Sequence, residues 1–119
     1  ISGSAFLNCV NLTTIDFGKN SKLRLIAGSV FENCTKLASI EIPETVTLLG
    51  NKVFGGCLAI KSIIVPAGVK TMGRYVFSGW TEDQIIYFAN LTEAPSGWHS
   101  EWFDSSDATV VWNYQPETF

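Results

Sequence analysis

The stretch that decides the fold is Val46–Pro66, VTLLGNKVFGGCLAIKSIIVP. Its apolar residues stand at fixed positions, and the same spacing returns elsewhere in the chain. Matching copies are marked by phenylalanines at intervals of 25, 23 and 23 residues: Phe6, Phe31, Phe54 and Phe77. Three residues after each phenylalanine come Cys9, Cys34, Cys57 and, in the fourth copy, Trp80. So many matched positions identify an internal repeat, and a repeat of this length determines the fold.

The repeating unit is V-x-x-I-G-x-x-[AV]-F-x-x-C-x-x-L-x-x-I-x-[IV]-P. This unit resembles the BspA-like, or Treponema-type, leucine-rich repeats of bacterial surface proteins, and specifically the C-terminal portion of such an array. The resemblance covers residues 1–88, and residues 94–112 resemble the segment that often ends these arrays. The sequence departs from the pattern at Asp83, where an apolar residue is expected, at Trp80, and at Gly18–Lys22, where the first junction carries two extra residues.

The predicted fold is an α/β solenoid, a leucine-rich-repeat right-handed superhelix with one parallel β-strand per repeat. Apolar residues alternate in the I-x-I part of the unit, as in a strand with one buried face. We expect strands at residues 13–17, 38–42, 61–65 and 84–88. The remaining part has apolar residues three or four apart, which predicts a short extended piece and a short helical turn on the convex side. Gly50 and Gly73 are expected to permit the corner between them.

We expect a single domain in two parts. Residues 1–88 form leucine-rich repeats in about four coils. Residues 89–119 form an irregular C-terminal cap with a final strand near Ala108–Tyr114 and an aromatic lid. The first coil shows no cap, so we expect a fragment of a longer chain and self-association through the uncapped N-terminal coil. Equivalent side chains of stacked coils should form columns, above all the four phenylalanines.

Composition and cysteine spacing limit the classes of ligand that the protein is expected to bind. The net charge is −3 and only 16% of residues are charged, so nothing favours binding to nucleic acid. No apolar run is long enough for membrane insertion. The three cysteines occupy one repeat position, which favours a ladder of small buried thiols over a disulfide. A spacing of 23 to 25 residues lacks the paired ligands of a zinc site, so we expect no metal and no cofactor.

The sequence predicts no enzyme. His99 is the single histidine, and a nucleophile would need it together with Asp104 or Asp107 as the orienting group. The surrounding residues read instead as a surface loop, and no nucleophile elbow or phosphate-binding loop is present. Three tripeptides match the N-glycosylation acceptor, starting at Asn11, Asn33 and Asn90, and they matter only in a eukaryotic secretory host.

The exposed strand face is the predicted binding site. The middle residue of I-x-I must point out of the core, and stacking aligns these residues into the column Asp16, Glu41, Ile64 and Tyr87. The position two residues earlier contributes Ile85. Solenoids use such a face for partners, and tyrosine beside aliphatic residues suits an interface anchor. The alternative is that the C-terminal segment covers Ile85 and Tyr87. Trp98 and Trp102 are read as cap core or as exposed aromatic contacts.

The family resemblance implies a recognition module of a secreted or cell-surface protein that binds a protein or a glycan, including adhesion to host or matrix proteins. It also implies an extracellular location, although no signal peptide opens the chain. The alternative function is structural: a spacer or C-terminal cap of a longer solenoid, with no external ligand.

Overall fold

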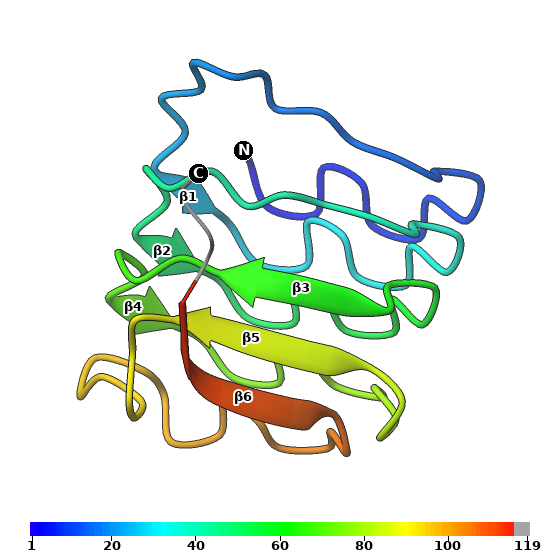
Figure 1. Ribbon diagram of the computed structural model, residues 1–119. Coiled ribbons are helices and arrows are strands. Elements are labelled where there is room, and N and C mark those ends of the chain that lie inside the picture. The colour runs from blue at the N-terminus through cyan, green and yellow to red at the C-terminus, as the bar shows by residue number, and fades with distance from the viewer. Residues whose placement is uncertain (116–119) are drawn as a thin grey trace.

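The computed structural model describes residues 1–115, which wind through a stack of coils (Figure 1). Two three-stranded parallel sheets run along the stack. The first contains β1 (Leu25–Ile26), β2 (Leu48–Leu49) and β4 (Thr71–Met72). The second contains β3 (Ser62–Val65), β5 (Ile85–Ala89) and β6 (Thr109–Tyr114). The predicted solenoid with parallel strands is therefore confirmed.

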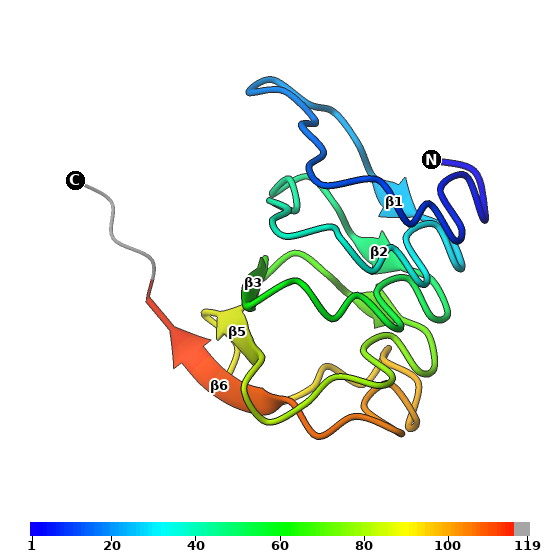
Figure 2. The same ribbon diagram turned by 90° about the vertical axis from the view of Figure 1, so that its right-hand side faces the viewer.

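The second sheet is shorter than the sequence predicts. The strands expected at residues 61–65 and 84–88 are confirmed as β3 and β5. The strands expected at 13–17 and 38–42 are wrong, because these segments share only one parallel bridge, between Thr14 and Ser39. The extra residues in the first junction lengthen the first coil on this side, and the coils lie farther apart there than on the opposite side (Figure 2).

Proline stands at the same repeat position in two coils. Pro66 directly follows β3, and Pro43 holds the matching place one coil earlier. Proline has no N–H to donate, so it cannot continue a ladder of hydrogen bonds. In the next coil Ala89 stands at this position, and β5 includes it.

Stacked phenylalanine rings form the centre of the core, as predicted. Neighbouring ring centroids lie 5.6, 6.1 and 5.9 Å apart, with planes inclined by 4°, 4° and 17°. Phe31, Phe54 and Phe77 are fully buried, and Phe6 in the first coil is partly exposed. Leucine, isoleucine and valine from successive coils surround the rings. Each coil therefore buries its neighbour's apolar side chains, since one coil alone cannot.

The predicted helical turns are not confirmed, because residues 1–115 contain no helix. The segment after each short strand of the first sheet is a run of tight turns, with Gly55 N bonded to Lys52 O and Cys57 N bonded to Phe54 O, both at 3.1 Å. Lys52 (φ 59°) and Gly56 (φ 73°) adopt left-handed backbone conformations. A right-handed helix cannot contain such residues, so the left-handed positions account for turns where apolar spacing indicated a helix.

The described part of the 89–119 segment continues the stack. Met72 bridges Trp98, Tyr75 N bonds Glu101 O at 3.0 Å, and β5 pairs with β6. Residues 95–114 thus follow the path of the preceding coil. The final strand predicted near Ala108–Tyr114 is observed as β6. The division of the domain at residue 88 stays a prediction.

Replacing Phe54 by alanine should lower the free energy of unfolding by about 3–5 kcal/mol, because it leaves a cavity between two neighbouring rings. Leu58→Ala is the matched control: Leu58 is 48% exposed and its truncation should cost less than about 1 kcal/mol. Urea unfolding followed by circular dichroism measures both. Equal losses in the two variants would contradict the stacked core.

Gly50→Ala should destabilise the protein by about 1–3 kcal/mol, since the added methyl group would lie 2.7 Å from the carbonyl carbon of Ala27 in the preceding coil. The control is Gly68→Ala, whose methyl group would meet Glu44 O at an ordinary 3.5 Å. Thermal unfolding of both variants tests whether the close approach of the preceding coil excludes a side chain at position 50. Equal melting temperatures of the two variants would contradict this explanation.

Candidate binding face

The strand face comprises the outward side chains of β3, β5 and β6 and of the matching positions in the first two coils. Its ten members, in chain order, are Thr14, Asp16, Ser39, Glu41, Ser62, Ile64, Ile85, Tyr87, Thr109 and Val111. Alternation along each strand separates these residues from the buried ones. In β3, for example, Ser62 and Ile64 are exposed whereas Ile63 and Val65 are buried.

The C-terminal half of the strand face has an apolar centre. Ile64 pairs with Tyr87, and Tyr87 pairs with Val111, so these three residues form one row across the sheet. Ile64 is 42% exposed, so it adds apolar surface to this row. Ile85 and Tyr87 are half-buried. The C-terminal segment therefore lies beside these residues as β6, and it leaves both partly open to solvent.

Tyr114 joins this apolar centre through a β-bulge. The register between β5 and β6 shifts after Tyr87, so that Ala89 pairs with Tyr114. Asn113, in the bulge, has a left-handed φ of 54°. The ring centroids of Tyr87 and Tyr114 lie 4.7 Å apart, tilted by 43°. The sequence prediction missed Tyr114 because strict alternation places it on the inner face; the asparagine was the available signal for a bulge.

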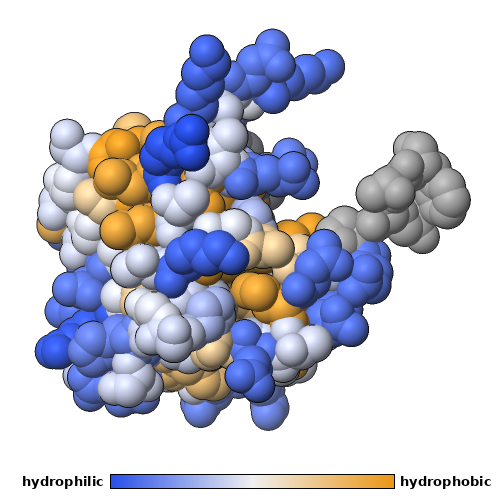
Figure 3. All heavy atoms as spheres, turned by 90° about the vertical axis from the view of Figure 1, so that its left-hand side faces the viewer, coloured by the Kyte–Doolittle hydropathy of each residue, from blue (hydrophilic) through white to orange (hydrophobic). Residues whose placement is uncertain are grey.

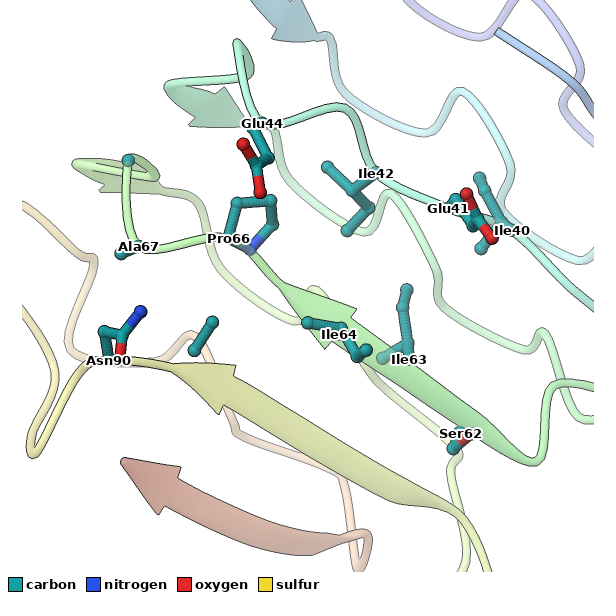
Figure 4. Close-up of a pocket in the computed structure, with 12 residues that line it drawn as sticks. Ile40, Glu41, Ile42, Glu44, Ser62, Ile63, Ile64, Pro66, Ala67 and Asn90 are labelled. Atoms are coloured by element: carbon teal, nitrogen blue, oxygen red, sulfur yellow. The ribbon is translucent and has the colours of Figure 1, made fainter. Parts of the chain in front are cut away.

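The N-terminal half of the strand face is acidic and hollowed. Asp16 and Glu41 are exposed, as predicted for outward positions. A crevice of about 690 Å³ separates the segment that carries Glu41 from β3 (Figure 4). Glu44 also lines it, and Asn90 closes its far end. The structure thus brings Ile64, Ile85 and Tyr87 together and leaves Asp16 and Glu41 on the far side of the crevice.

Trp98 belongs to the core and not to the surface. It is 6% exposed, and its indole N–H donates to Val69 O at 3.0 Å. Its ring lies 5.2 Å from both Phe88 and Trp102. The reading of Trp98 as an exposed aromatic contact is therefore wrong. Trp102 is half-buried in the same cluster, where it packs edge-on to Phe88 at 5.4 Å.

Comparison with known proteins identifies the repeat. The family model described as "BspA type Leucine rich repeat region (6 copies)" matches residues 1–103. The chain belongs to the BspA-type leucine-rich repeat family. No curated protein matches it significantly.

A solved structure agrees with this family assignment. The chain is similar to a leucine-rich repeat protein from Bacteroides ovatus whose crystal structure is known. The two share 32% sequence identity, and their structures align with a TM-score of 0.62. The match covers 94% of this chain and 24% of that protein, so this BspA-type chain spans a small part of its relative's length.

The cysteine position of the BspA-type repeat supplies a hydrogen-bond donor. Cys34 Sγ donates to Phe6 O at 3.1 Å, and Cys57 Sγ donates to Phe31 O at 3.0 Å. In each case the acceptor lies one coil earlier in the stack. All three cysteines are free, which agrees with the predicted ladder of thiols. Burial raises the pKa of the Cys34 thiol, and it raises the pKa of Cys57 to about 12.

The two departures near Trp80 preserve this bonding. Trp80 replaces the cysteine, and its indole N–H donates to Phe54 O at 2.8 Å. Asp83, at the expected apolar position, is exposed, and the neighbouring Gln84 is buried instead. The amide nitrogen of Gln84 donates to Cys57 O at 3.1 Å and Ile60 O at 2.8 Å. Trp80 therefore keeps the hydrogen bond of the cysteine position, and the amide nitrogen of the buried Gln84 is satisfied by two backbone carbonyls.

His99 is engaged by neighbours other than the acids suggested for a catalytic pair. Its Nδ1 accepts the Glu101 backbone N–H at 3.0 Å, and its Nε2 lies 3.2 Å from Arg74 Nη2. Within residues 1–115, no group of three or more His, Cys, Asp or Glu side chains is arranged to hold a metal ion. In the same range, no helix is long and apolar enough to cross a membrane.

The first coil and its neighbourhood expose further apolar surface. Leu7, Val10 and Leu25 are 38%, 50% and 43% exposed. Phe6, Leu12, Ile15 and Phe17 are only partly buried against the core. On the side of the molecule that Figure 3 displays, apolar surface gathers in separate areas among hydrophilic side chains.

The native protein should react slowly at Cys34 and Cys57 with a disulfide reagent such as dithionitrobenzoate at pH 8, because burial keeps both thiols protonated and inaccessible. Only the thiol of Cys9, which is partly exposed, should react readily; all three should react in denaturant. The visible absorbance of the released thionitrobenzoate follows the reaction. Rapid reaction of three thiols in the native state would contradict the buried ladder.

Proposed function

We propose that this chain is a partner-binding module of a bacterial secreted or cell-surface protein, and that the strand face binds a protein or a glycan. The supporting observation is the row formed by Ile64, Tyr87 and Val111, to which the bulge adds Tyr114. Tyrosine pairs beside partly exposed aliphatic residues are typical of interface centres, because they bury much area and still offer a hydroxyl group.

The surroundings of this row suit recognition. Hydroxyl groups of Ser62 and Thr109 flank it, and carboxylates of Glu41 and Asp16 continue the face beyond the crevice. An apolar centre with a polar rim is the usual anatomy of a binding interface. Adhesion to host or matrix proteins, and hence an extracellular location, is the finer form of this proposal, and it draws on the family to which the chain belongs.

Tyr87→Ala should weaken capture of the bound ligand about tenfold or more when the chain is screened against extracellular-matrix glycoproteins and a glycan array. Glu41→Lys should weaken capture of a basic partner. The control is Thr71→Ala, in β4, which changes an exposed residue of the other sheet and should leave capture unchanged. Unchanged capture by both strand-face variants removes this face as the binding site.

The second candidate function is a structural spacer within a longer solenoid. It is favoured by the partly exposed Phe6, Leu12 and Phe17, which a further coil or a second copy would cover. In this proposal the exposed first coil also drives self-association. Sedimentation velocity of the chain and of Val10→Asp tests the self-association: association that the substitution abolishes supports this use of the first coil, and a monomer at all concentrations contradicts self-association through it.

A further inference from the structure

One edge of β3 has no strand partner. Ile85 N donates to Lys61 O at 3.0 Å, so the alternating pattern of a parallel ladder directs the backbone groups of Ser62 and Ile64 away from β5. They face the segment of residues 38–42. Across the described residues, no hydrogen bond joins that segment to residues 62–65. The N–H and C=O groups of Ser62 and Ile64 are therefore free to pair with another chain.

This free edge lines the crevice. Ile40 and Ile42, each 7% exposed, and Ile63, 2% exposed, form its apolar floor. Ser62 and Ile64 lie exposed at its rim (Figure 4). Open edges of this kind add strands, because the incoming backbone supplies the missing donors and acceptors.

The charged residues that line the crevice are all acidic. Glu41 and Glu44 line it, both are exposed, and its lining contains no lysine or arginine. An adjoining hollow adds Asp16 and a single lysine, Lys19. A basic segment would meet complementary charge on entering, and an acidic one would be repelled.

We propose that the crevice binds an extended, basic polypeptide segment of a partner protein, which adds as a strand to the free edge of β3. This inference rests on the proposed function of the strand face and names the partner's chemistry. β3 has four residues and Pro66 follows it, so the ladder has room for about four or five residues of the partner. Alternate side chains of that segment point to the isoleucine floor and to solvent near the glutamates.

The probe is the peptide acetyl-Lys-Val-Lys-Val-Lys-Val-amide, titrated into the intact chain by calorimetry. Two further peptides carry backbone N-methyl groups at alternate residues, one in each register, and a third has glutamate for lysine. Strand addition predicts that one N-methylated isomer binds at least about tenfold more weakly than the parent, since each methyl group removes a ladder hydrogen bond. Equal affinity of all four peptides, or no binding of the parent peptide, overturns the proposal.

The double variant Glu41→Gln with Glu44→Gln tests the charge. It should weaken binding of the lysine peptide several-fold and reduce the salt dependence of its affinity. Glu82→Gln, an exposed carboxylate outside the crevice lining, is the matched control and should change neither. Equal effects of the double variant and the control would overturn the role of the crevice.

Amide hydrogen exchange decides whether the edge is open in solution. In the free chain the amides of Ser62 and Ile64 should exchange much faster than those of Ile63 and Val65, and the peptide should slow them. Slow exchange at all four residues without peptide would mean that residues 38–42 close on β3, which overturns the proposal. The Tyr87→Ala variant distinguishes the two proposals. If this variant loses glycoprotein or glycan capture while the intact chain does not bind the peptide, the strand face remains the binding site and only the crevice inference is overturned.

Discussion

The spacing of successive coils is fixed on the side of the tight turns, and the rest of the structure follows from it. There the backbone N–H groups of Phe6, Phe31 and Phe54 bond to a carbonyl of the next coil, as in Phe31 N to Val53 O at 3.1 Å and Phe54 N to Val76 O at 3.0 Å. The rings stack beside these bonds. The cysteine thiols bond back to the preceding coil. Close approach leaves no room for a side chain at Gly50.

The strand side obeys a weaker constraint, and this asymmetry places the candidate binding surface. Pro66 directly follows β3, Pro43 holds the matching place one coil earlier, and the first two segments share only one bridge, between Thr14 and Ser39. The sheet is complete only from β3 to β6. An ordered apolar row therefore lies beside an acidic crevice on one face. On the turn side, backbone N–H and C=O groups already bond to neighbouring coils, so fewer of them are left to pair with a partner.

The periodicity of the sequence predicted most of the fold, because side chains at equivalent positions of successive repeats stack on one another. The phenylalanine column, the thiol ladder and the strands near β3 and β5 could all be read from spacing. Helical turns could not be excluded from apolar spacing alone, since the deciding feature is the left-handed residue before each cysteine, Asn8, Asn33 and Gly56. The row of Ile64 and Tyr87 followed from alternation, whereas Tyr114 depends on a bulge and the crevice on missing hydrogen bonds between coils.

Energetic coupling between rings tests the stacked column most directly. Double-mutant cycles with leucine at positions Phe31, Phe54 and Phe77 compare a contacting pair with a pair separated by one coil. Stacking predicts a coupling free energy of about 0.5–3 kcal/mol between Phe31 and Phe54, and additivity within about 0.5 kcal/mol between Phe31 and Phe77. Full additivity for the contacting pair would contradict the account of a solenoid stabilised by its neighbouring coils.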